Sequence, residues 1–283
     1  MALLDRFRSQ SPQNHPDVHV RLAHVAALAI DDRAGVAALA EIARVDPEPR
    51  VRRAAVEKLL DVEVLATAAR SDTDESVRAA AVAMLRDIAV EAFEGIGEAE
   101  SLAAVAALHT VADARGLLQT ARTASRQTVA ARALSHVDDN RMLGSLARHA
   151  GLEIVRVGAL ESLRARGDDH EILAVALNGE HKETAIGAVE LLTTRAAIEQ
   201  AAARSKNKNA AKRARVRLQE WDERLARAAV EQAAAAAEAT RVAADAHAQE
   251  VPSSMSTDAL IDPSASPVPT PAASETPERQ ASA

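Results

Sequence analysis

Aliphatic and small residues recur at a regular spacing along most of the chain. The clearest copies are nonamers that begin at Val51 and Val77 and read Val, Arg, any residue, Ala, any residue, aliphatic, two further residues and Leu. Related nonamers begin at Val20 and Val155, the latter with Gly at the fourth position. Because positions 1, 4, 6 and 9 are close to helical spacing, the pattern predicts an amphipathic helix that buries this flank.

The period extends the pattern to weaker copies. The nonamers start at 20, 51, 77, 103, 129, 155, 184 and 211, and four successive gaps between these starts are 26 residues. The copy at Val129 lacks the small residue at position 4, and the last copy carries its leucine, Leu218, one residue early. Self-similarity at a fixed period is typical of repeat arrays.

A second apolar signal lies about twelve residues before most nonamers, where an aliphatic residue is followed four residues later by Ala. These pairs are Leu39 and Ala43, Leu65 and Ala69, Leu117 and Ala121, Leu143 and Ala147, and Ile172 and Ala176. The fourth unit departs from the pattern, with Val90, Phe93 and Gly95 in this region. Each unit is therefore predicted to be two short antiparallel helices, which must stack on their neighbours to bury their apolar faces. The predicted fold is all-α, a right-handed α-solenoid of about eight helix pairs.

Composition shifts predict four segments. Residues 1–14 are expected to cap the first layer, and residues 15–220 to form the solenoid. Residues 221–250 are rich in Ala and Glu without Gly or Pro, which favours a helix. Residues 251–283 are rich in Pro, Ser and Ala and have few large apolar residues. Such a tail cannot bury enough surface to offset chain entropy, so disorder is predicted there.

Composition also limits the classes of function. Aromatic residues make up 1% of the chain and Cys is absent, so disulfides, thiolate metal sites and Cys nucleophiles are excluded. No apolar run approaches the roughly 18 residues of a membrane span, and the first ten residues lack a secretory signal pattern. We therefore expect a cytoplasmic protein that does not associate with a membrane. The net charge of −7 arises from Glu220 onward, which leaves the repeat body neutral and disfavours a nucleic-acid track along it.

The repeats resemble HEAT repeats of the armadillo-like class. The resemblance rests on the stretches 46–56, which reads Asp-Pro-Glu-Pro-Arg-Val-Arg-Arg-Ala-Ala-Val, and 72–82. More narrowly, 86–93 and 206–214 are similar to bacterial HEAT-like regions that stand ahead of a domain of unknown function 349. The resemblance implies a protein-binding scaffold whose second helices form the inner, concave face. Surface positions of the nonamers, Arg53, Glu57, Lys58, Ala83 and Glu161, are then the expected partner contacts.

Two sets of basic residues are candidates for binding anions. An arginine recurs at the second nonamer position, as Arg21, Arg52, Arg78 and Arg156. It could grip an acidic peptide or phosphates, but pairing with turn carboxylates such as Asp46 and Asp72 is the favoured interpretation.

The second set is a dense cluster near the end of the repeats. It comprises Lys206, Lys208, Lys212, Arg213, Arg215 and Arg217. It could contact RNA or an acidic partner, although no aromatic residue for base stacking interleaves it, and a solvated helix face is favoured.

No combination of residues indicates catalysis. His170-Glu171 is a lone pair, whereas HEAT-like deoxyhypusine hydroxylases use several His-Glu pairs to hold two irons. The histidines at 15, 19 and 24 and the adjacent Ser135, His136 and Asp138 have unsuitable spacing for a metal site or a triad. The sequence thus predicts a non-catalytic protein-binding scaffold without metal or cofactor. The alternative is a nucleic-acid- or ribosome-associated factor that uses the basic cluster.

Overall fold

The computed structural model describes residues 12–249, with side chains described through Asp245. These residues form fourteen α-helices and no β-strand, which confirms the all-α prediction. The predicted tail at 251–283 and most of the N-terminal segment lie outside the described residues. None of the described helices is long and apolar enough to span a bilayer.

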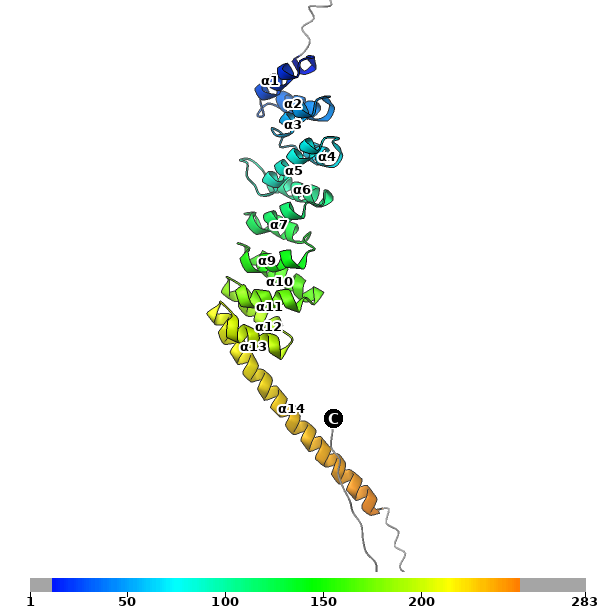
Figure 1. Cartoon of the computed structure of the whole chain (residues 1–283), viewed down its shortest axis with the longest axis vertical. Helices are drawn as coiled ribbons and strands as arrows, with labels where there is room; N and C mark the ends of the chain where they lie inside the picture. The colour runs from blue at the N-terminus through cyan, green and yellow to red at the C-terminus, as the bar shows by residue number, and fades with distance from the viewer. Residues whose placement is uncertain (1–11, 250–283) are drawn as a thin grey trace, which may run out of the picture. The chain divides into compact units, whose positions relative to one another are not determined.

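The helices follow one another with short connections (Figure 1). A short 3-10 helix, η2 (Pro12–Asn14), precedes α1 (Val18–Ala27), α2 (Arg33–Val45), α3 (Pro49–Val56), α4 (Val62–Ser71), α5 (Glu75–Ala89), α6 (Glu98–Thr110) and α7 (Ala114–Thr123). The rest are α8 (Gln127–Leu134), α9 (Asn140–His149), α10 (Glu153–Arg166), α11 (Asp169–Asn178), α12 (Lys182–Leu191), α13 (Arg195–Arg204) and α14 (Lys208–Gln249).

The chain forms two compact units. The first ends at Ala226 and the second starts at Arg227. The predicted boundary between 220 and 221 therefore falls inside α14, six residues before the end of the compact unit. Helix α14 is continuous because no Gly or Pro interrupts it from Lys208 onward. Its residues from Asp222 to Asp245 are exposed.

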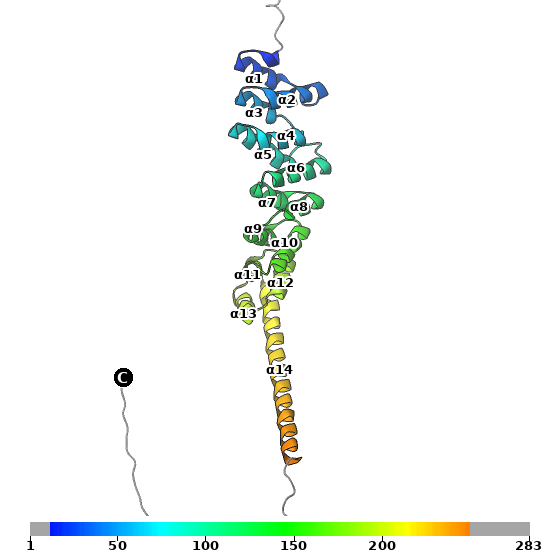
Figure 2. The ribbon, with the colours of Figure 1, turned by 90° about the vertical axis from the view of Figure 1, so that its right-hand side faces the viewer.

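Helix pairs are the building blocks of the first unit. The partners α2 and α3, α4 and α5, α7 and α8, α9 and α10, and α11 and α12 are in contact. We call the earlier member of each pair the first helix and the later member the second helix. We count α13 among the first helices. We count α1 and the start of α14 among the second helices. Second helices also contact the next second helices, and first helices contact the next first helices, as with α3 and α5 or α9 and α11 (Figure 2). Neighbours in the sequence are therefore neighbours in space.

Short polar side chains start several of these helices. Asp61 and Asp74 accept hydrogen bonds from backbone N–H groups in the first turns of α4 and α5, and Asp17 does the same for α1. Such caps satisfy donors that a helix leaves unpaired at its N-terminus. The acidic turns of the sequence therefore define where helices begin.

The first helices bury the residues that the sequence singled out. Leu39, Leu65, Leu117, Leu143 and Ile172 are at most 3% exposed, and the alanines one turn later are also buried. This part of the predicted core is confirmed. The small alanine side chains allow the neighbouring helix to approach closely.

The second helices confirm most of the predicted flank of the nonamer but correct its small position. In the copies at Val51, Val77 and Val155, positions 1 and 9 are buried as predicted, whereas the small residues at position 4, such as Ala54 and Gly158, are only half-buried and position 5 is buried instead. At position 5, Ala55, Ala81, Ala133, Ala159 and Ala188 are all fully buried. Because residues four apart form the ridges that pack into a neighbouring helix, position 5 and not position 4 is the site of close approach.

The fourth unit departs from the two-helix pattern. Residues 90–97 form no helix, so α6 follows α5 directly and contacts α4, α5, α7 and α8. The chain turns there with Glu91 and Gly95 in the left-handed region, at φ 63° and 83°. The predicted register fails in part here: Ala103 and Ala106, at positions 1 and 4, are exposed, whereas Leu108 at position 6 is buried as predicted.

The last copy shows a smaller error of register. Ala210 and Ala214 are fully buried at the start of α14, and Leu218 packs against the core. The nonamer therefore starts at 210 rather than 211, which places Leu218 at position 9. The leucine that seemed one residue early marks the true register.

Candidate functional site

Two buried ion pairs join consecutive layers in the first half of the unit. Arg21 donates from Nε and Nη2 to the Asp46 carboxylate at 2.8 and 3.1 Å. Arg52 donates in the same way to Asp72 at 2.8 and 2.7 Å. Each aspartate directly follows a first helix of the next layer, so the paired guanidinium ties two layers together. These arginines are structural, in agreement with the favoured interpretation of the sequence.

Arginines at the second nonamer position also bind the turn that precedes their own helix. Arg52 donates from Nη1 to the Asp46 carbonyl at 2.9 Å, and Arg78 donates to the Asp72 carbonyl at 2.8 Å. Hydrogen bonds from Arg52 lower the pKa of Asp72, which keeps this carboxylate charged. Arg52 therefore donates to a carbonyl of the turn before its own helix and also neutralises the carboxylate of the next turn.

The pairing changes in the second half. Arg156 is 8% exposed and donates from Nη1 to the carbonyls of Ala150 and Gly151 at 2.9 and 2.7 Å. Its Nε has no hydrogen-bond partner among the described residues. The residue that directly follows the next first helix, α11, is Gly179, whereas Asp46 and Asp72 follow α2 and α4. The buried charge of Arg156 therefore lacks the carboxylate that Arg21 and Arg52 have.

Three of the second helices expose the same two nonamer positions, whereas in α8 and α12 the residues at position 3, Ala131 and Ile186, are half-buried. Positions 3 and 7 remain exposed in α3, α5 and α10 and lie one helical turn apart. We call the surface formed by these positions the second-helix face. It includes Arg53 and Glu57 on α3, Ala79 and Ala83 on α5, and Val157 and Glu161 on α10.

The second-helix face combines charged residues with small and apolar ones. Val157 is 41% exposed, and the adjacent Ile154 is 47% exposed. Arg53 and Glu57 pair with each other at 2.8 Å, so they add little net charge. The large exposed aliphatic side chains on α10 make this part of the surface suitable for a protein contact.

Of the remaining residues predicted on this surface, Glu161 is exposed but Lys58 is engaged within the chain. The Lys58 ammonium donates to the carbonyls of Val25, Ala26 and Leu28 at 2.8–3.0 Å. It thus caps the C-terminal end of α1. Lys58 is therefore a structural residue.

The basic cluster divides into two groups of different orientation. Arg213 pairs with Glu190 and Glu220, and Arg217 donates to the carbonyls of Val189 and Leu192. These two arginines attach α14 to α12. In contrast, the Lys206, Lys208 and Lys212 side chains make no hydrogen bond or ion pair with any described residue and are exposed. The sixth member, Arg215, is exposed and donates only to the Ala202 carbonyl, at 3.3 Å. Three lysines and Arg215 therefore form the solvent-facing part of the cluster.

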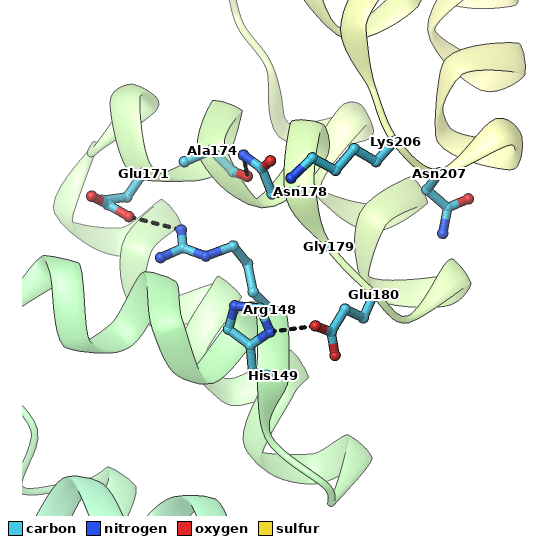
Figure 3. A pocket seen from close by; sticks show the side chains of 9 residues that line it. All are labelled: Arg148, His149, Glu171, Ala174, Asn178, Gly179, Glu180, Lys206 and Asn207. Atoms are coloured by element: carbon cyan, nitrogen blue, oxygen red, sulfur yellow. Dashed lines mark hydrogen bonds and ion pairs between the residues drawn. The ribbon is translucent and has the colours of Figure 1, made fainter.

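Lys206 lines a pocket that the sequence did not indicate, which we call the turn pocket (Figure 3). It has a volume of about 630 Å³ and is formed by the ends of α9 and α11 and by the turn before α14. Its side chains are Arg148, His149, Glu171, Ala174, Asn178, Glu180, Lys206 and Asn207, with Gly179 at its wall.

Both carboxylates of the turn pocket already have partners. Glu171 accepts from Arg148 at 3.2 Å, and Glu180 lies 3.0 Å from Nδ1 of His149 (Figure 3). The Lys206 ammonium has no such partner, and the side chains of Asn178 and Asn207 also line the space. The turn pocket therefore offers a cation and two amides to a ligand.

The histidines do not form a metal site among the described residues, where no group of three or more metal-ligating side chains occurs. His109 and His136 stack with ring centroids 4.1 Å apart. Burial lowers the pKa of His136, and the nearby His109 and Arg132 add to this effect. The neutral form of His136 therefore suits the stack.

Comparison with known proteins returned no matching family model, no matching curated protein and no matching solved structure.

Proposed function

We propose that this chain is a non-catalytic scaffold of the HEAT class, a right-handed α-solenoid that binds a protein partner along the concave face formed by its second helices. The supporting observation is the second-helix face, where the same two positions are exposed in α3, α5 and α10. Its exposed Val157, the adjacent Ile154 and its alanines provide apolar surface, and two of its charged residues, Arg53 and Glu57, pair with each other. A surface of this kind gains free energy when a partner covers it.

The proposal is tested by placing a charge on the second-helix face. Val157→Glu and Ala83→Glu each add a carboxylate where a partner would bury the surface, and unpaired buried charges oppose binding. We expect a specific protein retained from native lysate by the wild-type chain to be lost at least about tenfold with either variant. Mass spectrometry of the retained proteins provides the measurement.

Ala203→Glu is the matched control, because Ala203 is exposed on the first helix α13. It should retain the same protein as wild type, and circular dichroism should show equal helix content for all variants. Equal retention by the wild type and by both second-helix variants would reject this face as the binding surface.

The arrangement of the basic cluster argues against the alternative of a nucleic-acid-binding factor. Arg213 and Arg217 are committed to contacts with α12, so the exposed cluster is smaller than the sequence suggests. Phosphate contacts need accessible cations, and the three remaining lysines and Arg215 have no aromatic residue interleaved among them for stacking.

A further inference from the structure

We propose that the turn pocket is a binding site for an acidic peptide segment, with Lys206 as the residue that receives a carboxylate. The site lies at the ends of first helices and involves no residue of the second-helix face. The inference therefore stands apart from the proposed scaffold surface and goes beyond it.

The Lys206 ammonium is the group of the pocket that favours a negatively charged ligand. Glu171 accepts from Arg148 and Glu180 lies 3.0 Å from Nδ1 of His149, whereas Lys206 is a cation without a partner in the described chain. Asn178 and Asn207 present amide groups that can donate to carboxylate oxygens. Charge-assisted hydrogen bonds of this type are the stronger ones in proteins.

A second, independent observation is the buried charge beside this pocket. Arg156 binds the carbonyls of Ala150 and Gly151, the two residues that directly follow His149 of the pocket. Two of its equivalents, Arg21 and Arg52, are neutralised by Asp46 and Asp72, whereas Arg156 has Gly179 at the corresponding place and forms no ion pair within the described part of the chain. The uncompensated guanidinium adds positive potential to this edge of the molecule.

Neighbouring lysines extend the positive surface beyond the pocket. Lys208 and Lys212 follow Lys206 on α14 and are exposed. The volume of about 630 Å³ is in the range of pockets that hold a few side chains. An extended peptide could therefore place one carboxylate in the pocket and others near the lysines, which is why we favour an acidic peptide over a single small anion.

The probe for the test is a fluorescein-labelled ten-residue peptide of alternating Glu and Ala, used with the full chain. Fluorescence anisotropy should show saturable binding that weakens as salt is added, and the same peptide with Gln in place of Glu should not bind. Lys206→Glu should weaken binding at least about tenfold, because it turns the receiving cation into a repelling anion.

Arg33→Glu is the control, since it reverses the charge of an exposed residue on α2, which lies outside both the pocket and the neighbouring lysines. It should weaken binding less than about threefold if the pocket is the site. Equal losses for the two variants would overturn the pocket and indicate a general charge effect. Tighter binding of a ten-nucleotide oligouridine than of the Glu peptide would overturn the peptide class in favour of RNA.

Discussion

Arg52 and Arg53 are adjacent in the sequence but have opposite roles. Arg52 is 8% exposed and forms a bidentate pair with Asp72, whereas the Arg53 pair with Glu57 is about half exposed. Removing one partner of a buried ion pair leaves an uncompensated charge, while an exposed pair contributes little. Burial, and not residue type, decides what each arginine contributes.

Arg52→Ala should therefore lower the free energy of unfolding by about 3–5 kcal/mol, since Asp72 would be left buried without its partner. Arg53→Ala should change it by less than about 0.5 kcal/mol. Urea unfolding followed by circular dichroism measures both values. Similar losses for the two variants would show that the Arg52–Asp72 pair is not a main tie between layers.

The same pair predicts a dependence of stability on pH. Hydrogen bonds from Arg52 lower the pKa of Asp72 in the folded chain, so Asp72 stabilises the fold above its unfolded pKa of about 3.9. This contribution is lost as the pH falls through the lower, folded pKa. The difference in unfolding free energy between wild type and Asp72→Asn should be constant above about pH 5 and shrink below about pH 4. A difference that stays constant throughout would contradict the pairing.

At the scale of helices, position 5 of the nonamer sets how closely second helices can approach. Ala159 on α10 is fully buried, whereas Ala83 on α5 is exposed. Alanine has no side-chain entropy to lose and occupies little volume, so repeated alanines at one position allow the layers to stack.

Ala159→Leu should lower the unfolding free energy by roughly 1–3 kcal/mol because the added atoms have no space between the helices. Ala83→Leu, the same change at an exposed position, should stay within about 0.5 kcal/mol of wild type. Urea titration at one temperature compares the two. If Ala159→Leu were tolerated as well as Ala83→Leu, the close approach at position 5 would be disproved.

The loop at 90–97 interrupts this regularity at the scale of one element. Salt bridges from Arg86 to Asp113 and from Arg126 to Glu91, both at 2.6 Å, hold the segments on either side of α6. Gly116 makes room for the first pair, since a Cβ there would lie 2.1 Å from an Asp113 oxygen. Ion pairs thus accompany the change of pattern where one helix is absent.

At the scale of the molecule, the two compact units should differ in what they contribute to stability. The core of the first unit runs from Val25 to Ala214 as one cluster, whereas residues 222–245 are exposed. Apolar burial is the main stabilising contribution to folding, so the first unit should hold most of the stability.

A fragment that ends at Ala226 should therefore unfold in urea with a free energy within about 1 kcal/mol of the full chain. The slope of its unfolding free energy against urea concentration should also be similar to that of the full chain, because the deletion removes little buried surface. Circular dichroism should lose helical signal only in proportion to the deleted part of α14. A fragment that fails to unfold cooperatively would show that the first unit depends on the second.

The sequence by itself determined that the chain is helical, where the helices of most units lie and which residues of the first helices are buried. These features depend on local periodicity, capping and helix propensity, which a single stretch of chain contains. The row of Leu39, Leu65 and Leu143 could be read directly for this reason. The repeated nonamers also indicated the period, but the register predicted for the copies at 103 and 211 was wrong in part.

Only the tertiary structure decided which side chains of the repeat are structural and which remain available. Lys58, Arg213 and Arg217 bind groups that are 23 to 33 residues away in the chain, and no local pattern marks such partners. The turn pocket likewise combines α9, α11 and the turn before α14. Its lysine is unpaired because the neighbouring carboxylates, Glu171 and Glu180, contact Arg148 and His149 instead. Ion pairs and pockets are properties of distances between segments, and these distances exist only once the layers have stacked.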